Sequence, residues 1–298
     1  MPEKPEVITV ANSLKNLILN RKITGCNIYW DNIIAYPVSN EFKNKIIGQK
    51  IESINTRGKW IVIDLDKDSL LVHLRMEGKF MFRDKGEVIG KHEHVELILD
   101  DKTSFRFHDV RKFGKMYLIP KDEVYDVKPL NEIGLEYYDS NLTKEYLYDA
   151  IHSKRLPIKT VLLDQSIIAG IGNIYDDEIL FMSGIHPLRK ACDVSLDECE
   201  KIINNTKIVL DKAVKLGGTT IRSFTSSEGV HGLFQNELLV HGKSGNKCPT
   251  CGRIIEKNKV GGRGTYFCSD CQKKDIFILF FLLIIYMFYD KIYGALRR

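Results

Sequence analysis

The first residues of the chain place a nitrogen nucleophile beside a carboxylate. The sequence begins MPEKPEV, and a proline at position 2 favours removal of Met1, which would make the Pro2 amine the N-terminus. An α-amino group titrates near about pH 8 and a lysine above about 10, so a free Pro2 amine is a nucleophile at neutral pH. Glu3 is its direct neighbour in the chain. Taken alone, the segment is better explained as an ordinary solvated arm.

Four cysteines near the C-terminus have the spacing of a zinc site. They are Cys248, Cys251, Cys268 and Cys271, in two CxxC pairs. Four thiolates leave no open coordination position, so the spacing predicts one structural Zn²⁺. A redox pair or a coincidental disulfide pair is the alternative. Gly261, Gly262 and Gly264 suit the turn of a β-hairpin with Arg263 near its tip, where an arginine can reach a phosphate.

A third segment has the pattern of a helix, a glycine turn and a second helix. Residues 158–181 are IKTVLLDQSIIAGIGNIYDDEILF, and Asn173 lies where it would cap the second helix. A helix N-terminus with free N–H groups is a ready phosphate site. On this pattern alone, Gly170 and Gly172 only permit a tight turn and Asn173 only caps.

Other candidate residues have ordinary structural explanations when each is taken alone. Lys59 in TRGKWIV is a solvated lysine at a hairpin edge, and Met76 and Phe113 are typical core residues. Arg111 next to Phe113 is more suggestive, because an arginine and an aromatic residue on one loop can form a wedge that enters a base stack.

The segments that must position these residues divide the chain into a β part and a helical part. Alternating segments rich in β-branched and aromatic residues predict strands over Ile23–Tyr117, with a helix before them over 7–20. Residues 128–141 lack periodicity and predict a linker. Helices are predicted over 143–216, followed by a Gly-, Ser- and Thr-rich loop at 217–232.

Composition indicates a globular protein with an acidic partner. The 298 residues are 44% hydrophobic and 28% charged, enough for two domains with their own cores. Residues 243–274 carry a net charge of +6 and residues 1–242 a net charge of −2, which favours nucleic acid as the partner. Seven cysteines and no secretory signal argue against a disulfide framework, so Cys26, Cys192 and Cys199 are expected to be reduced thiols.

The end of the chain does not fit this description. Residues 276–289 form 14 uninterrupted apolar or aromatic positions, fewer than the roughly 20 that a spanning helix needs. Three explanations stay open: an interfacial membrane anchor, a packing helix, or sequence that does not belong to the functional protein.

The order of several short motifs is more specific than any one of them. They are PEKPEV, TRGKWIV, HLRMEGKF, KHEHVEL, DVRKFG, AGIGNIYDDE, GGTTIRSF and the four cysteines with GRGTYFC. In this order the chain resembles the bacterial formamidopyrimidine-DNA glycosylases, bifunctional enzymes that remove oxidised purines and cut the strand. The resemblance runs from residue 2 to about residue 273, and Lys4 departs from it, at a position where a leucine is common. That departure is expected to matter little.

The resemblance implies roles for particular residues. Pro2 would attack the sugar C1′ and form an iminium, Glu3 would be the general acid/base, and Glu6 would help to hold the site. Lys59 would assist the β-elimination, and Arg263 would clamp phosphate and assist the δ-elimination. The remaining implied roles are gap filling for Met76, Arg111 and Phe113; DNA contact for His92, Arg111, Lys154 and Asn173; and a flipped-base pocket of Glu6, Glu77, Ile221, Arg222, Ser223 and Phe224.

The fold expected from pattern and resemblance is α+β. It has an N-terminal two-layer β-sandwich with flanking helices, a C-terminal helical domain with a helix–two-turns–helix, and a four-cysteine zinc finger. The expected boundaries are 1–130 for the catalytic domain, 131–142 for a linker, 143–237 for the helical domain with its flap loop, 238–273 for the finger and 274–298 for the apolar tail.

The expected partner is double-stranded DNA with a damaged base, bound by a monomer that needs no small-molecule cofactor. The expected location is the bacterial cytoplasm, at the nucleoid, with membrane attachment through 276–289 left open. Three rival functions remain at this point. They are an endonuclease VIII-like glycosylase for oxidised pyrimidines, a non-catalytic zinc-finger DNA-binding protein, and a membrane-tethered protein whose tail is the functional element. The Met76, Arg111 and Phe113 set and the long 217–232 loop favour the purine enzyme.

Overall fold

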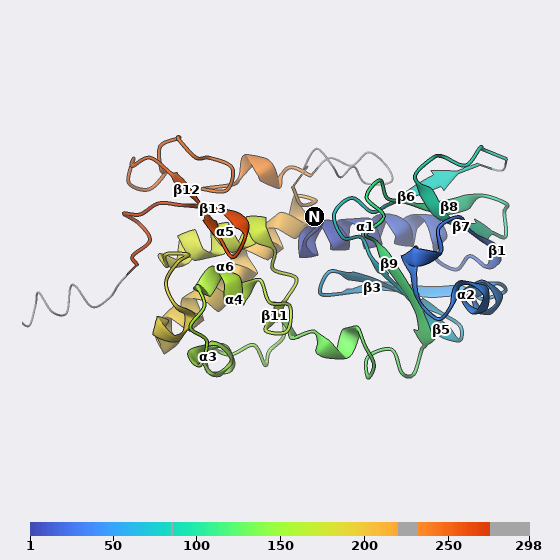
Figure 1. Cartoon of the computed structure of the whole chain (residues 1–298), viewed down its shortest axis with the longest axis horizontal. Coiled ribbons are helices and arrows are strands. Elements are labelled where there is room, and N and C mark those ends of the chain that lie inside the picture. The colour runs from blue at the N-terminus through green and yellow to red at the C-terminus, as the bar shows by residue number, and fades with distance from the viewer. Residues whose placement is uncertain (85, 220–231, 275–298) are drawn as a thin grey trace, which may run out of the picture.

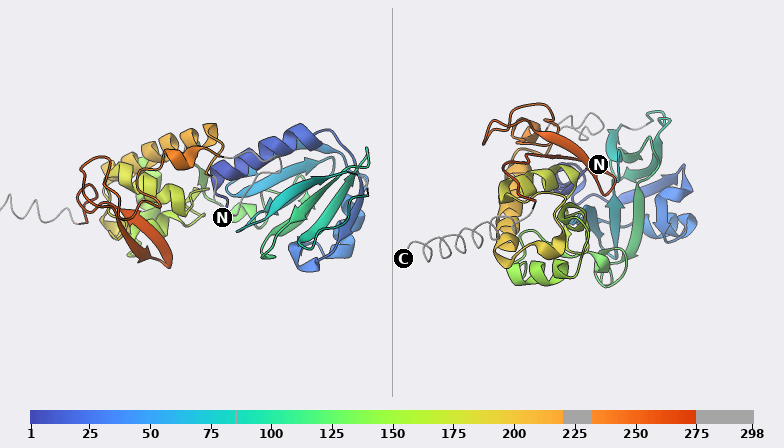
Figure 2. Two further views of the ribbon diagram at one scale, coloured as in Figure 1. Left: turned by 90° about the horizontal axis from the view of Figure 1, so that it is seen from above. Right: turned by 60° about the vertical axis from the view of Figure 1, so that its left-hand side comes forward.

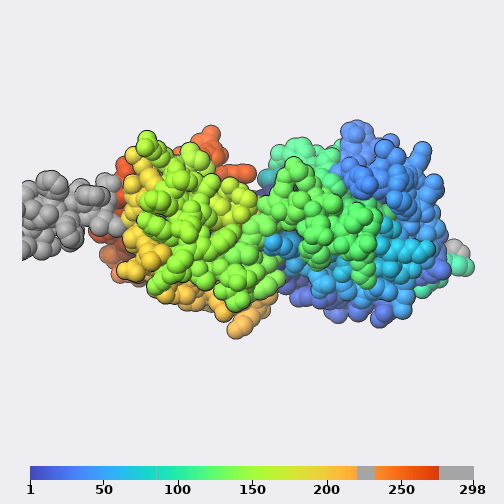
Figure 3. All heavy atoms as spheres, turned by 90° about the horizontal axis from the view of Figure 1, so that it is seen from below, coloured from blue at the N-terminus to red at the C-terminus, as the bar shows by residue number. Residues whose placement is uncertain are grey.

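The chain forms two lobes with the N-terminus at their junction. The computed structural model describes residues 1–84, 86–219 and 232–274. The lobes meet at a narrow waist, which the space-filling view shows clearly (Figure 3). Residues up to the strand β9, including the first two helices, build one lobe. The later helices and the C-terminal hairpin build the other (Figures 1 and 2).

The N-terminal lobe is the expected sandwich of two sheets. Four strands form one sheet in the order β1 (Ile23–Ile28), β7 (Glu93–Leu99), β8 (Ser104–His108) and β6 (Lys79–Arg83). Five strands form the other in the order β2 (Ile34–Tyr36), β9 (Lys115–Pro120), β5 (Asp68–His73), β4 (Trp60–Leu65) and β3 (Ile51–Arg57). Neighbouring strands are antiparallel except for the parallel β2–β9 pair.

Strand β4 shows why the sequence makes these layers. Its residues WIVIDL alternate between two cores, because successive side chains of a strand point to opposite faces. Ile61 and Ile63 pack into the main core with the helix α1 (Lys4–Ile18) and the other sheet. Trp60 and Val62 pack on the opposite face with a smaller cluster. Apart from Asp64, strand β4 is therefore apolar instead of alternating with polar residues.

Two elements differ from the sequence-based expectation. The first helix begins at Lys4, earlier than the predicted 7–20, because Pro5 in the first turn lacks an N–H group that would need a partner there. A helix, α2 (Ser39–Ile46), lies inside the region expected to be all β. Only Phe42 and Ile46 of this helix are buried, four residues apart, which is too weak a pattern to predict the helix.

The C-terminal lobe packs its helices around a second core. The helices are α3 (Lys144–His152), α4 (Ile158–Leu162), α5 (Asn173–Ser183) and α6 (Leu196–Lys215). Helix α5 is buried on nearly every side, and Tyr175, Ile179 and Leu180 belong to the core. A short parallel pair, β10 (Leu135–Glu136) with β11 (Ile168–Ala169), ties the segment between the lobes to the turn before α5.

The basic module near the C-terminus forms the predicted hairpin. Strands β12 (Glu256–Val260) and β13 (Arg263–Phe267) pair antiparallel, and Gly261 and Gly262 make the turn with positive φ angles of 54° and 80°. Strand β13 packs on α5, and Figure 1 shows the hairpin beside that helix. Arg263 therefore starts the strand directly after the turn.

Across the described ranges 1–84, 86–219 and 232–274, no helix has the length and apolar character needed to cross a membrane. The apolar run 276–289 lies outside those ranges, as do Ile221, Arg222, Ser223 and Phe224 of the expected flipped-base pocket.

Candidate active site

A cavity of about 430 Å³ opens where the N-terminus meets both lobes. Its lining combines residues from distant parts of the chain: Met1, Glu3, Lys59, Met76, Leu163, Gly172, Asn173, Ile174, His241, Gly262, Arg263 and Gly264. Five of the residues expected from the sequence therefore meet here: Glu3, Lys59, Met76, Asn173 and Arg263.

Glu3 is held by the start of helix α5. Its carboxylate accepts hydrogen bonds from the backbone N–H groups of Ile174 (3.0 Å) and Tyr175 (3.4 Å). These amides have no partner inside the helix, and the helix dipole favours an anion at this end. The Glu3 side chain lies directly against Gly172, which has no Cβ to displace it. The carboxylate is buried and fixed at one edge of the cavity.

Glu6 braces Glu3 from one helical turn away. Its Oε2 accepts the backbone N–H of Glu3 at 2.8 Å, and its Oε1 accepts the Tyr175 hydroxyl at 2.5 Å. The N–H and the hydroxyl of Thr219 also donate to Oε1. Burial, and then the negative charge of Glu3, raises the pKa of Glu6. Glu6 acts on the site by holding the N-terminal segment, and it does not line the cavity.

The surroundings of the N-terminal amine lower its pKa. Pro2 is buried, and Met1 lines the cavity. Burial lowers the pKa of the Met1 amine, the carboxylates of Glu3 and Glu6 oppose this shift, and the cations Lys59 and Arg263 add to it. An amine in this position is more readily deprotonated than an exposed one, as a nitrogen nucleophile requires.

Lys59 connects the two lobes at the cavity. It lies on the β3–β4 turn of the N-terminal lobe, and its Nζ donates to the carbonyl of Ile171 in the turn before α5, at 2.7 Å. Only 5% of the residue is exposed. Burial lowers the pKa of the Lys59 amine, although Glu3, Asp176 and Glu6 favour its charged form. The lysine is therefore a desolvated amine and not the solvated edge residue that local sequence indicates.

The zinc-module hairpin closes the opposite side of the cavity. Asn173 donates from Nδ2 to the carbonyl of Gly264 at 3.0 Å, which couples the start of α5 to the strand that carries Arg263. Asn173 is the first residue of α5 and Gly172 is its N-cap, so the prediction that Asn173 caps the helix is wrong. Among the described residues its Oδ1 has no hydrogen-bond partner.

The candidate gap-filling residues do not all reach the cavity. Met76 lines it, whereas Arg111 and Phe113 lie on the β8–β9 loop, with Phe113 exposed and the Arg111 guanidinium 4.7 Å from its ring centre. Asp109 shapes this loop, because its buried carboxylate accepts the N–H groups of Arg111, Phe113 and Gly114. The sequence analysis missed the role of Asp109 in this loop. The only feature of the sequence that could have indicated it is an aspartate four residues before Phe113.

The other expected contacts lie outside the cavity lining. His92 and Glu77 are half-buried on the N-terminal lobe, and Lys154 is half-buried after α3 on the C-terminal lobe. The structure brings none of these three into the cavity. A partner that touched them together with the cavity would have to extend across both lobes.

Lys4 has a larger structural role than its sequence position indicated. It is completely buried, and its Nζ contacts Glu136 Oε1 at 2.9 Å and Thr56 Oγ1 at 3.1 Å. The same Glu136 oxygen accepts the N–H of Gly58, next to Lys59. This ion pair joins the N-terminal segment, the β3–β4 turn and the segment between the lobes. The expectation that the departure at Lys4 matters little concerned chemistry, and the structure adds a packing role beside the site.

Behind the cavity lies a buried charged cluster that the sequence analysis missed. Lys159 and Asp177 are both buried and form an ion pair of 2.5 Å, and Asp177 Oδ2 is 2.7 Å from Nδ1 of His241. Asp176 is also buried, and neither of its oxygens has a partner among the described residues. Burial raises the pKa of Asp176 well above its usual value. The pattern offered no signal for these contacts, because they join segments 18 and 64 residues apart.

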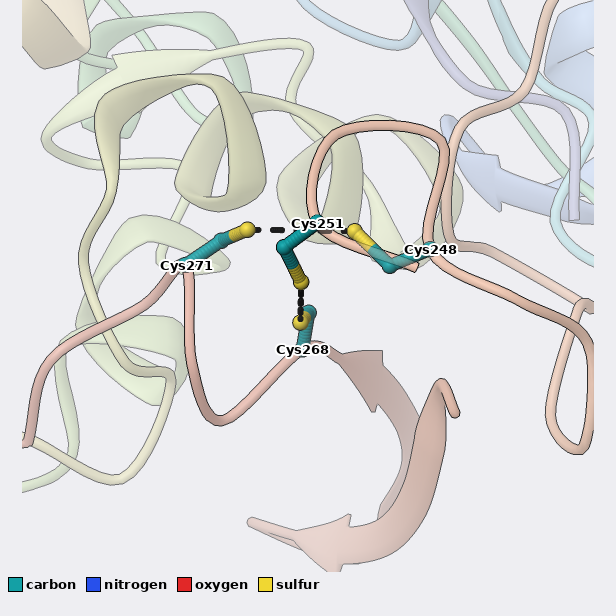
Figure 4. A group of neighbouring side chains, drawn as sticks. All are labelled: Cys248, Cys251, Cys268 and Cys271. Atoms are coloured by element: carbon teal, nitrogen blue, oxygen red, sulfur yellow. Dashed lines mark hydrogen bonds between the residues drawn. The ribbon is translucent and has the colours of Figure 1, made fainter. Parts of the chain in front are cut away.

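The four cysteines converge as a metal site requires. Their Sγ atoms all lie within 4.8 Å of one another, and the Cys248–Cys271 and Cys251–Cys268 pairs are 3.8 and 3.5 Å apart (Figure 4). A tetrahedral Zn–S₄ centre with bonds of about 2.3 Å has sulfurs about 3.8 Å apart. The donor set and its size fit zinc, which would pin the base of the hairpin that carries Arg263.

Three family models match the chain. They are the formamidopyrimidine-DNA glycosylase N-terminal domain over residues 1–116, the formamidopyrimidine-DNA glycosylase H2TH domain over residues 133–225, and the zinc finger found in FPG and IleRS over residues 245–274. The last match, together with the sulfur geometry, confirms the predicted zinc site.

Curated relatives match over almost the whole chain. The formamidopyrimidine-DNA glycosylase of Bacillus cereus is 43% identical over 275 residues, which cover 92% of this chain and 100% of the relative. The Bacillus subtilis enzyme of the same name is 42% identical with the same coverage.

Solved structures of Lactococcus lactis Fpg with DNA have the same fold. Its complex with abasic-site DNA aligns with a TM-score of 0.84 at 34% identity, covering 91% of this chain and 100% of that one. The wild-type complex with DNA containing N7-benzyl-Fapy-dG gives 0.85 at 35% identity, with coverage of 92% and 100%. These matches confirm the resemblance seen in the sequence, and the chain belongs to the formamidopyrimidine-DNA glycosylase family.

Proposed function

We propose that this chain is a bifunctional DNA glycosylase and AP lyase of base excision repair that excises oxidised purines, including 8-oxoguanine and formamidopyrimidines. The observation that carries the proposal is the single cavity that collects Met1, Glu3, Lys59 and Arg263 from separated parts of the chain. The names of the curated relatives and the damaged DNA bound to Lactococcus lactis Fpg support the same activity.

The first chemical step uses the N-terminal amine. Removal of Met1 leaves the Pro2 nitrogen at the cavity, where it attacks the sugar C1′ as the damaged base departs. Glu3 lies beside it, held by the α5 amides, and transfers the proton that opens the sugar ring. A secondary amine forms an iminium directly. Burial lowers the pKa of the Met1 amine at this end of the chain, and the same surroundings would act on the amine of Pro2.

The iminium then acts as the electron sink for strand cleavage. It acidifies the neighbouring sugar C–H bond, so phosphate is lost by elimination. Lys59, a desolvated amine, assists the β-elimination, and Arg263 clamps phosphate and assists the δ-elimination. Zinc, when bound by the four cysteines, stabilises the hairpin and supplies no open position for chemistry.

The remaining site residues serve DNA binding in this proposal. Met76, Arg111 and Phe113 fill the gap left by the everted nucleotide, and His92, Lys154 and Asn173 contact the DNA backbone. Glu6 and Glu77, together with the segment 221–224 outside the described residues, are proposed for the flipped-base pocket. The spread of these residues over both lobes suits a duplex that crosses the waist of the molecule (Figure 3).

We propose the domain boundaries expected from the sequence: 1–130, a linker at 131–142, 143–237 and 238–273, followed by the tail 274–298. Since the proposed substrate is the chromosome of a bacterium, the proposed place of action is the cytoplasm, at the nucleoid.

Borohydride trapping tests the activity. The full chain is incubated with a duplex carrying one 8-oxoguanine opposite cytosine, the iminium is reduced, and mass spectrometry locates the adduct. An adduct on Pro2 with strand nicking supports the proposal. DNA binding without adduct or nicking refutes it and leaves a zinc-finger DNA-binding protein.

Oxidised pyrimidines are the alternative substrate, because one Lactococcus lactis Fpg structure contains DNA with an oxidised pyrimidine. A duplex with 5-hydroxycytosine in parallel separates the two substrate classes. Faster single-turnover excision of the pyrimidine would favour the endonuclease VIII-like alternative.

A further inference from the structure

His241 is a titratable side chain in the cavity wall that the proposed mechanism does not use. It belongs to the segment between α6 and the zinc module, and it lines the cavity together with Glu3, Lys59 and Arg263. Its side chain keeps 18% of its surface exposed. One edge of the imidazole is therefore available to whatever occupies the cavity.

The inner edge of the imidazole is bound to a buried carboxylate. Nδ1 lies 2.7 Å from Oδ2 of Asp177, which also accepts the N–H of Tyr266 at 3.2 Å. The other Asp177 oxygen pairs with Lys159 at 2.5 Å. Since a carboxylate with these donors is an acceptor only, Nδ1 must carry the hydrogen. This assigns the tautomer of the neutral ring and leaves Nε2 as its unprotonated nitrogen.

The ring is fixed in this orientation by its surroundings. The Tyr266 ring meets it edge-on with centroids 4.8 Å apart. The backbone N–H groups of Leu239, Val240 and His241 all donate to the buried carboxylate of Glu178. Nε2 has no hydrogen-bond partner among the described residues. A preorganised aspartate–histidine pair with one free nitrogen is the arrangement that proton transfer requires.

The charges around His241 select a phosphate as its partner. Lys59 and Arg263 face the cavity as cations, Glu3 is the carboxylate there, and Lys159 lies behind Asp177. A departing phosphate monoester accepts a proton, and an imidazolium whose Nδ1 is held by the Asp177 carboxylate can donate one.

We propose that His241 is the general acid of the second strand cut and gives its Nε2 proton to the phosphate that Arg263 holds. The proposal rests on the glycosylase and lyase function proposed above. In this step the Glu3 carboxylate removes the C4′ proton of the β-elimination product, and the C5′–O bond breaks. The electron pair leaves on the phosphate oxygen, the imidazolium proton moves to that phosphate, and neutral imidazole remains bound to Asp177.

The test separates the two cuts on one substrate. A duplex with an abasic site, labelled at the 5′ end of the cut strand, gives an unsaturated aldehyde end after the first cut and a 3′-phosphate after the second. His241→Gln should slow the second cut by about 100-fold and the first cut far less, so the aldehyde end accumulates. His152→Gln, an exposed histidine on α3, is the matched control and should behave as the wild type.

Two further results decide the proposal. In His241→Ala, added imidazole should restore the second cut and leave the first unchanged, with zinc content equal to that of the wild type. A second cut at the wild-type rate in His241→Gln, equal slowing of both cuts, or no rescue by imidazole would each overturn the assignment. Failure of the proposed function gives a different result, because the wild-type chain itself would then form no borohydride adduct and cut neither bond.

Discussion

The contact between Gly172 and Glu3 gives the sharpest prediction for the catalytic site. A methyl carbon added at Gly172 would lie 2.5 Å from Oε1 of Glu3 and closer still to its Cγ and Cδ. Gly172 has φ −126° and ψ −171°, an extended conformation that alanine adopts without strain. Gly172→Ala therefore acts through the Glu3 carboxylate and not through the backbone of the turn.

The expected loss follows from the displacement. Ordinary contact requires about 3.5 Å or more, so the Glu3 carboxyl must move by about 1 Å and leave the N–H groups of Ile174 and Tyr175. A misplacement of this size in a catalytic group costs about 100-fold in rate. That factor corresponds to about 2.7 kcal/mol of transition-state stabilisation.

The assay is single-turnover excision of 8-oxoguanine with the enzyme in excess, followed by thermal unfolding of the same preparation. Gly172→Ala should lose about 100-fold in excision rate and remain folded. The control is Gly25→Ala on β1, where the new methyl comes nearest to the flexible end of Ile98, with Cδ1 at 3.1 Å and Cβ at 3.4 Å. A Gly172→Ala rate within threefold of the wild type, or an equal loss in Gly25→Ala, would refute the reasoning.

Three further predictions concern stability and metal. Burial raises the pKa of Asp176, so the folded state keeps a proton that the unfolded chain releases above about pH 4. The free energy of unfolding therefore falls as pH rises above that value. Asp176→Asn should gain stability over the parent by up to about 1.4 kcal/mol per pH unit in urea unfolding between pH 5 and 8, and a constant margin would contradict this. Lys4→Met leaves the buried Glu136 carboxylate without its lysine and should lower the free energy of unfolding by about 3 kcal/mol. Adding Glu136→Gln should recover much of that loss. Unchanged unfolding midpoints would contradict this prediction. Chelation of zinc should abolish nicking of damaged duplex, and added zinc should restore it, whereas full activity of metal-free protein would show that the hairpin needs no metal.

Much of the architecture was predictable because it is encoded locally. The apolar, β-branched run of β4 and the helical pattern of α6 identify their elements, since each depends on neighbours a few residues away. The α2 helix was missed because only two of its eight residues, Phe42 and Ile46, are buried. Two apolar positions are too few to show a helical period in the sequence. The start of α1 was misplaced because a charged residue such as Lys4 is rarely buried, and the pattern counts it as exposed.

The sequence by itself determined the chemistry that adjacent or closely spaced residues can do. Pro2 and Glu3 are neighbours through a covalent bond, and Cys248 and Cys251 form a knuckle because two residues separate them. Only the tertiary structure decided that Glu3 rests on the amides of α5, 171 residues away, and that His241 is oriented by Asp177. Such contacts depend on how the two lobes pack around the N-terminus, so the spacing of residues along the sequence does not predict them. The burial that makes Lys59 a desolvated amine has the same origin, because the carbonyl of Ile171 that receives it belongs to the other lobe.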